Sequence, residues 1–141
     1  MPGKLFIDTN VWIYLLLQPQ HPADVAKRDK AKYLLEQHSH LVVSNQVIHE
    51  IANVLLKKYH IEITQVERNV KEILNVVELY LLSDHTVFVA LQLLHHYKLS
   101  FYDALIVAAA LETQCQFLYS EDLQAGQEIE GKLKIINPFS E

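Results

Sequence analysis

The chain has very little of the chemistry that stabilises small secreted proteins. Cys115 is the single cysteine in 141 residues, which excludes an intramolecular disulfide framework and a cysteine-rich zinc site. One lone cysteine predicts a reducing, cytoplasmic compartment. No apolar run approaches the roughly 18 residues that a membrane span needs, and the N-terminus lacks the layout of a signal peptide. We therefore expect no membrane-embedded segment.

Glycine and proline are also scarce, with three and four residues, so few positions interrupt regular structure. Basic side chains number 12 against 17 acidic ones, and the formal net charge is −5. This deficit of Lys and Arg argues against an ordinary basic nucleic-acid-binding module, whose affinity comes from cations on phosphates. Half of the residues are hydrophobic, which is enough to build a packed core.

Short apolar segments alternate along the chain with longer, more polar ones. The apolar segments predict strands at residues 4–8, 41–44, 77–82, 116–120 and 133–136. The intervening segments predict helices at residues 11–17, 24–39 and 46–60, from Thr64 onward, from Ser83 or Asp84 to about Lys98, and at residues 102–113. This alternation is typical of an α/β fold with a mostly parallel sheet of roughly five strands between two helical layers. We expect residues 1–141 to form a single domain.

Local signals predict where several helices begin. Thr9 or Asn10 offers a cap for the first helix, and Thr64 with Glu67 matches the capping-box pattern for the fourth. The last helix, over residues 102–113, is apolar on nearly every face. Such a helix is expected to be buried or to pack against another chain.

Four carboxylates fall where strands end or helices begin. Asp8 ends the first predicted strand, and Asp122 follows the fourth. Glu50 lies near the start of the helix after the second strand, and Asp103 lies in the first turn of the apolar helix. Because ligands bind beyond the carboxyl ends of strands in open α/β sheets, the topology predicts that these four acids converge there.

Each acid taken alone also has a structural explanation. Asp8 and Asp122 suit a helix N-terminus, and Ser100 with Asp103 matches a second capping box. Glu50 is different, because it falls at the edge of an apolar helical stripe, where an acid needs a partner or a cation.

Taken together, the four acids indicate a cation site. Two carboxylates about 4 Å apart repel by roughly 4 kcal/mol at an effective dielectric near 20. No Lys or Arg lies within two positions of any of the four. Oxygen ligands of this kind predict Mg²⁺ or Mn²⁺ rather than zinc.

Other site templates are absent. His49 and Glu50 begin like a zinc-protease helix, but Asn53 stands where the second histidine is needed. Glycine-rich phosphate loops and the Gly-x-Ser-x-Gly sequence do not occur. Acids at strand ends also suit a metal-dependent phosphatase or a phosphoreceiver. The phosphoreceiver would need a lysine beyond a late strand, whereas Lys132 and Lys134 lie before or inside the last one.

Four blocks of the sequence resemble a PIN domain, and more narrowly the VapC-type toxins of bacterial and archaeal toxin–antitoxin systems. The blocks are residues 6–10, Glu50, residues 99–106 and residues 118–123, in the expected order over nearly the whole chain. The resemblance implies a Mg²⁺- or Mn²⁺-dependent endoribonuclease of the cytoplasm. It also implies a homodimer and an antitoxin whose C-terminal segment covers the acidic groove.

The resemblance further implies roles for individual residues. Asp8 and Asp103 would be the main metal ligands, with Glu50 and Asp122 completing the site, while Glu121 has no implied role. The residues implied to orient these ligands or the attacking water are Thr9, Asn10 and Ser120. Apolar residues expected to be exposed are candidate antitoxin contacts, although each is at least equally well explained as ordinary core; they are Trp12, Tyr14 and Leu16. Candidate guides for the RNA backbone are Lys57, Lys58, Arg68 and Lys71. The alternative is a non-catalytic PIN-like module that only binds another protein.

Overall fold

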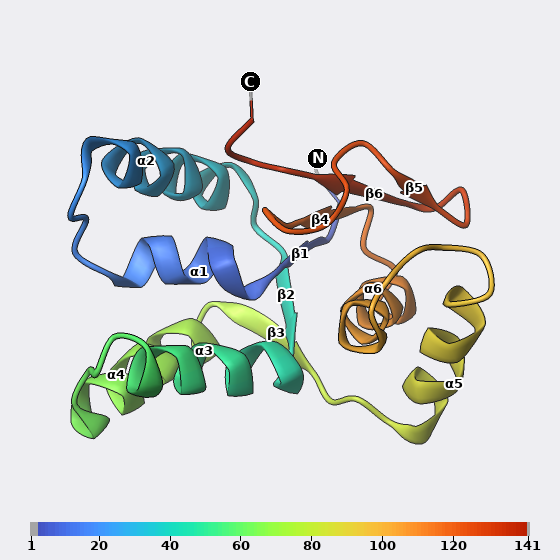
Figure 1. Ribbon diagram of the computed structural model, residues 1–141, viewed down its shortest axis with the longest axis horizontal. Helices are drawn as coiled ribbons and strands as arrows, with labels where there is room; N and C mark the ends of the chain where they lie inside the picture. The colour runs from blue at the N-terminus through green and yellow to red at the C-terminus, as the bar shows by residue number, and fades with distance from the viewer. Residues whose placement is uncertain (1–2, 141) are drawn as a thin grey trace.

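The computed structural model describes residues 3–140, which form six helices and six strands (Figure 1). The strands are β1 (Leu5–Ile7), β2 (Leu41–Ser44), β3 (Val77–Tyr80), β4 (Phe117–Tyr119), β5 (Glu128–Ile129) and β6 (Leu133–Ile136). The helices are α1 (Thr9–Leu16), α2 (Pro22–Gln37), α3 (Asn45–Lys57), α4 (Ile63–Leu74), α5 (Asp84–Leu93) and α6 (Phe101–Glu112).

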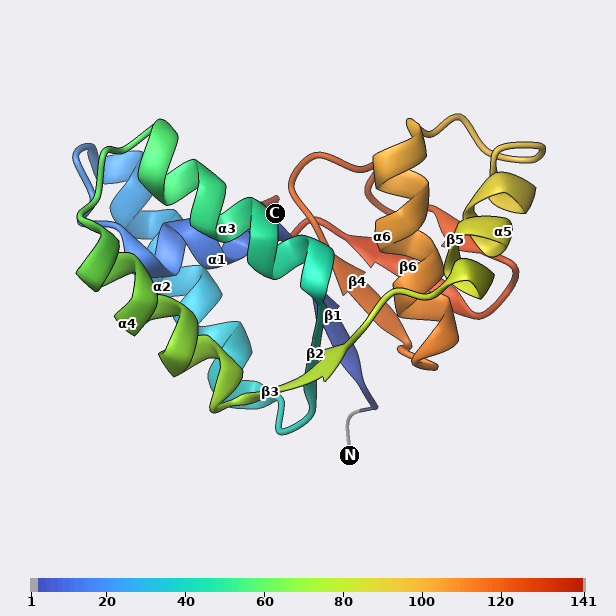
Figure 2. The same ribbon diagram turned by 90° about the horizontal axis from the view of Figure 1, so that it is seen from below.

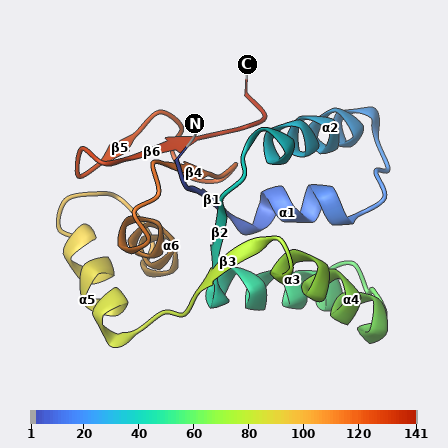
Figure 3. The ribbon, with the colours of Figure 1, turned by 180° about the vertical axis from the view of Figure 1, so that it is seen from behind.

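The strands form one sheet in the order β3-β2-β1-β4-β6-β5, and only the β5–β6 pair is antiparallel. Helices α1 to α4 lie on one side of this sheet and α5 and α6 on the other (Figures 1 and 3). The predicted three-layer α/β/α class is therefore confirmed, with six strands instead of roughly five. The additional strand, β5, has only two residues, which is too short to produce an apolar run in the sequence.

The buried elements lie where the apolar runs predicted them. All residues of β1 and β2 are buried, because each of these strands is paired on both sides and covered by helices on both faces. The expectation of a buried last helix is confirmed, since residues 104–110 of α6 are all buried. Over residues 3–140, no helix is both long and apolar enough to traverse a bilayer.

The first helix begins earlier than the sequence predicted. Asp8, rather than Thr9 or Asn10, is the N-cap of α1, because its Oδ1 accepts a hydrogen bond from the Thr9 N–H at 2.8 Å. The helix therefore starts directly at the end of β1, without an intervening loop. This arrangement fixes the Asp8 carboxylate at the carboxyl edge of the sheet.

Two other helix boundaries also differ from the prediction. The Thr64–Glu67 capping box is wrong, because α4 already begins at Ile63 and both residues lie inside it, with Glu62 as the N-cap. Helix α5 ends at Leu93 instead of about Lys98, because the backbone N–H groups of His95 and His96 bond to carbonyls only three residues back. Such bonds tighten the chain into a turn.

Candidate active site

The four predicted acids lie at one edge of the sheet, on elements that approach from both sides of it. Asp8 follows β1, and Asp122 follows β4. Glu50 is in the second turn of α3, and Asp103 is in the first turn of α6. Figure 2 shows α1 and α3 on one side of the central strands and α6 on the other. The sheet therefore gathers acids that are up to 114 residues apart in the sequence.

Asp8 is the most buried of the four acids, with 7% of its surface exposed. Its Oδ1 accepts the Thr9 N–H, and its Oδ2 accepts the Ser120 hydroxyl at 2.9 Å. Burial raises the pKa of Asp8 from 3.8 to about 6, and the charges of Glu50 and Asp103 add to this effect against the two hydrogen bonds. Ionised Asp8 is therefore held in an environment that disfavours its charge.

Glu50 is held in place from two sides. The Thr9 hydroxyl donates to its Oε1 at 2.6 Å, and the Gln46 side-chain amide donates to its Oε2 at 3.2 Å. The prediction that Thr9 orients a neighbouring acid is consistent with this contact. Gln46 was not predicted, although its position four residues before Glu50 on a helix places both side chains on one face.

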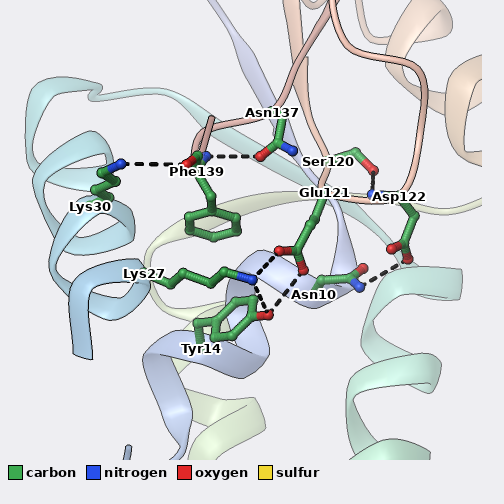
Figure 4. A network of polar contacts seen from close by, with 9 residues as sticks. All are labelled: Asn10, Tyr14, Lys27, Lys30, Ser120, Glu121, Asp122, Asn137 and Phe139. Carbon is green, nitrogen blue, oxygen red and sulfur yellow. Dashed lines mark hydrogen bonds and ion pairs between the residues drawn. The ribbon is translucent and has the colours of Figure 1, made fainter. Parts of the chain in front are cut away.

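Ser120 and Asn10 hold the loop that carries Asp122. Ser120 is fully buried, and its hydroxyl accepts the backbone N–H groups of Asp122 and Leu123, each at 3.2 Å. The Asn10 amide donates to Asp122 Oδ2 at 2.9 Å, as Figure 4 shows. One buried hydroxyl thus links Asp8 to the backbone at Asp122.

Asp103 is half-buried and lies close enough to Asp122 and Glu50 for their charges to affect its carboxylate. The Ser100 hydroxyl accepts the Asp103 N–H at 3.1 Å, so Ser100 caps α6 as predicted. The Asp103 carboxylate accepts no hydrogen bond within residues 3–140, so the second hydrogen bond of the predicted Ser100–Asp103 capping box is absent there. Burial raises the pKa of Asp103, and the charges of Asp122 and Glu50 raise it further.

Glu50 and Asp122 line a cleft of about 470 Å³ together with Thr9, Asn10 and Lys58, whereas Asp8 and Asp103 are not among the residues that line it. None of the four acids forms an ion pair with Lys, Arg or His in the part of the chain that the structure describes. The described His, Cys, Asp and Glu side chains also form no ready group of three or more that could hold a metal. The donor set is nonetheless all oxygen and mutually repulsive, which fits Mg²⁺ or Mn²⁺.

Glu121 belongs to a separate network on the far side of the same loop (Figure 4). It forms an ion pair with Lys27 of α2 and accepts the Tyr14 hydroxyl at 3.0 Å. The Lys27 ammonium also lies 4.8 Å from the centre of the Tyr14 ring. These contacts tie α1 and α2 to the loop between Ser120 and Asp122. Tyr14 also lines the cleft that contains Glu50 and Asp122, so the network lies beside that cleft.

We expect the Lys27–Glu121 pair to stabilise this loop. The Lys27→Met and Glu121→Gln variants should each lose about 1 kcal/mol of unfolding free energy, since the pair is partly buried and hydrogen-bonded. Urea titrations of both variants and of the double variant measure this loss. Lys30→Met on the same helix is the control, because Lys30 makes only an exposed 3.4 Å contact with the Phe139 carbonyl. Additive losses in the double variant would contradict a direct pairing.

The three predicted antitoxin contacts have different environments. Trp12 is buried, with 3% exposed, and its indole N–H donates to the Ile7 carbonyl at 3.2 Å. It is therefore a core residue, and its assignment as an exposed contact is wrong. Tyr14 and Leu16 are half-buried, and only Tyr14 lines the acidic cleft.

All four basic residues predicted to guide RNA are exposed, namely Lys57, Lys58, Arg68 and Lys71. Lys58 alone lines the cleft that contains Glu50 and Asp122. Lys57 and Lys58 lie at the C-terminal end of α3, whereas Arg68 and Lys71 lie on α4. Of this set, Lys58 is therefore the residue that shares a cleft with two of the acids.

The order of the strands and the acids at their carboxyl ends define a class of protein. A family model matches this chain and identifies the class. The chain belongs to the PIN domain family, whose model covers residues 5–127. This confirms the resemblance to a PIN domain that the four sequence blocks indicated. A search of curated protein sequences found no match.

Several solved structures share the fold. A toxin–antitoxin complex from Klebsiella pneumoniae contains a chain with 24% identity and a TM-score of 0.70, covering 95% of this chain and 97% of that one. VapC20 of Mycobacterium tuberculosis, a sarcin-ricin loop cleaving toxin, has 20% identity and a TM-score of 0.65, covering 81% and 86%. VapBC2 of Rickettsia felis, bound to a promoter DNA fragment, has 15% identity and a TM-score of 0.65, covering 95% and 99%. At these identities the likeness concerns the fold.

Proposed function

We propose that this protein is a divalent-metal-dependent endoribonuclease and the toxin component of a type II toxin–antitoxin system. The observation that carries the proposal is the gathering of Asp8, Glu50, Asp103 and Asp122 at one edge of the sheet without a basic partner among residues 3–140. Membership of the PIN family supports a nuclease, and the toxin and toxin–antitoxin complexes among the structural neighbours support a toxin.

Asp8, Glu50, Asp103 and Asp122 would hold Mg²⁺ or Mn²⁺. When bound, such an ion supplies Lewis-acid stabilisation of a phosphodiester and lowers the pKa of a bound water. Asp8 is ionised at neutral pH, since its pKa is about 6, and it can therefore serve as a ligand. The Asp103 carboxylate is free of hydrogen-bond partners within the described residues and lies within reach of the Asp122 and Glu50 charges.

The surrounding residues hold the acids in their orientation. Ser120 fixes one oxygen of Asp8, Thr9 fixes one oxygen of Glu50, and Asn10 fixes one oxygen of Asp122. Each contact leaves the carboxylate a free lone pair for a cation. Groups that hold metal ligands in this way affect affinity and activity nearly as strongly as the ligands do.

The remaining parts of the proposal concern context. We infer that residues 1–141 act as a single PIN domain, that two copies form a homodimer, and that a cognate antitoxin covers the acidic cleft. An antitoxin cation would find unpaired carboxylates there, and Lys58 would meet the RNA backbone at the cleft edge. The single cysteine, Cys115, is buried and free, which agrees with a reducing cytoplasm.

The direct test is an RNA cleavage assay with the purified protein. We expect cleavage of structured RNAs in Mg²⁺ or Mn²⁺, no cleavage in EDTA, and recovery when metal is restored. Products with 5′-phosphate and 3′-hydroxyl ends would match attack by water. Absence of metal-dependent cleavage across transfer, ribosomal and messenger RNAs would overturn the catalytic proposal and favour a non-catalytic interaction module.

A further inference from the structure

A second cleft, of about 340 Å³, lies against Glu50 between the beginnings of α3 and α6. Its lining includes Gln46 and His49 from α3 and Tyr102 and Leu105 from α6. Glu50 lines both this cleft and the larger one that contains Asn10 and Asp122. The two clefts therefore meet at one of the acids.

Tyr102 presents a large aromatic ring to solvent beside the acids. It is 66% exposed and immediately precedes Asp103 in the first turn of α6. The ring of Phe101 holds it edge-on, with centroids 5.5 Å apart and an interplanar angle of 70°. A ring supported on one edge and exposed elsewhere offers a face on which a planar group can stack.

Gln46 supplies a hydrogen-bond acceptor in the same cleft. Its Nε2 donates to Glu50 Oε2 at 3.2 Å and to the Tyr102 carbonyl at 3.1 Å. Because both of those partners can only accept, the amide nitrogen must face them, and the orientation of the side chain is fixed. Gln46 Oε1 is buried and has no hydrogen-bond partner among the described residues. Such an acceptor is costly to leave unmatched. Because solvent does not reach it in this structure, a ligand N–H pairs with it only when the side chains that cover it move apart.

We propose that this cleft binds a nucleobase of the RNA substrate, stacked on Tyr102 and donating an N–H to Gln46 Oε1. The inference rests on the proposed ribonuclease function and adds a subsite to it. An aromatic face together with a fixed polar acceptor is the combination that recognises unstacked bases in single-stranded RNA. Because Glu50 borders both clefts, a base bound here belongs to a nucleotide next to the phosphate at the acids.

The negative charge around the second cleft favours a neutral base over an anionic group such as a phosphate. Glu50 lies inside it and Asp103 follows Tyr102, so a phosphate here would meet negative charge. A base is neutral and carries N–H donors on its edge. The second cleft therefore suits the base, and the edge of the larger cleft at Lys58 suits the phosphate backbone.

The test compares Tyr102 variants with two single-stranded RNA decamers in Mg²⁺. Both decamers carry phosphorothioate linkages and a fluorescein label; one has a mixed sequence with bases, and the other has abasic sugars throughout. Fluorescence anisotropy gives the Kd for each. Tyr102→Trp keeps an aromatic face, and Tyr33→Ala is a matched control, because Tyr33 is similarly exposed, at 61%, on α2.

We expect Tyr102→Ala to weaken binding of the base-bearing decamer about tenfold, since stacking contributes about 1–3 kcal/mol per base. The abasic decamer should bind both proteins equally, and the Tyr102→Trp and Tyr33→Ala variants should resemble the wild type. Unchanged affinity in Tyr102→Ala, or an equal loss on both decamers, would overturn the subsite while leaving the ribonuclease proposal standing. A wild-type protein that neither binds nor cleaves RNA would overturn both proposals.

Discussion

The Asp8→Asn variant is expected to lose about 100- to 1,000-fold of the RNA cleavage rate, while the metal-free protein becomes more stable. The loss follows because a catalytic ion contributes several kcal/mol, and asparagine removes the charge that holds it. The gain follows because Asp8 is 7% exposed and lies within reach of the Glu50 and Asp103 charges. Asparagine keeps the shape of the side chain and still caps α1.

The pKa of Asp8 sets the pH range of this effect. It is about 6 in the folded protein and 3.8 ordinarily, so the folded state binds more protons than the unfolded state between these values. The contribution of Asp8 to the stability of the metal-free wild type therefore falls as pH rises from about 4 to about 6 and then stays level. The difference corresponds to roughly 3 kcal/mol at neutral pH, which is the upper limit of the gain expected from Asp8→Asn.

Urea unfolding of the EDTA-treated proteins at pH 4, 6 and 7.5, with and without Mg²⁺, measures these changes. Mg²⁺ should stabilise the wild type at pH 7.5, because it binds only the folded state, and should stabilise Asp8→Asn much less. Asp84→Asn is the control, since Asp84 is an exposed acid in the first turn of α5, away from the cleft. A less stable Asp8→Asn protein would contradict the expected repulsion and would show that the hydrogen bond from the Ser120 hydroxyl, whose acceptor oxygen asparagine replaces with an amide nitrogen, outweighs it.

The Ser120→Ala variant is expected to lose about 10- to 100-fold of activity and about 2 kcal/mol of stability. Ser120 is fully buried, and its hydroxyl joins Asp8 Oδ2 to the backbone N–H groups of Asp122 and Leu123. Alanine leaves the two N–H groups without their acceptor, which is the costly case for buried polar groups. It also frees Asp8 and the Asp122 loop to move, as when a supporting partner of a metal ligand is removed.

The Ser120→Thr variant is the matched control, because it keeps the hydroxyl and adds only a methyl group. Cleavage rates measured over a range of Mg²⁺ concentrations separate the two effects of Ser120→Ala. A higher Mg²⁺ requirement is expected if Ser120 orients Asp8. Lower stability with an unchanged Mg²⁺ requirement would limit Ser120 to a structural role.

The sequence predicts the positions of the acids well because strand ends are visible in the chain. Asp8 and Asp122 follow short apolar runs, and the parallel order of the sheet brings such ends together. Glu50 stands out because it is an acid at the edge of an apolar stripe. Local patterns of this kind contain the information that decides which edge of the sheet is polar.

The contacts that hold the acids depend on distant residues and are not visible in this way. Lys27 meets Glu121 across 94 residues, and Gln46 meets the Tyr102 carbonyl across 56. Neither pairing has a periodic or capping signal, because it arises from how α2 and α3 pack on the sheet. Trp12 was assigned to the surface for a related reason, since nothing local reveals that the Ile7 carbonyl accepts its indole N–H.

The central position of β1 has a consequence for the timing of synthesis. This early strand pairs with β2 on one side and with the late strand β4 on the other, and Ser120 reaches back across 112 residues to Asp8. At a translation rate of about 5–20 residues per second, that separation corresponds to on the order of 10 s. A nascent chain still attached to its ribosome therefore carries Asp8 for many seconds before its partner Ser120 exists. The acidic centre of this protein can thus assemble only after synthesis has passed residue 122.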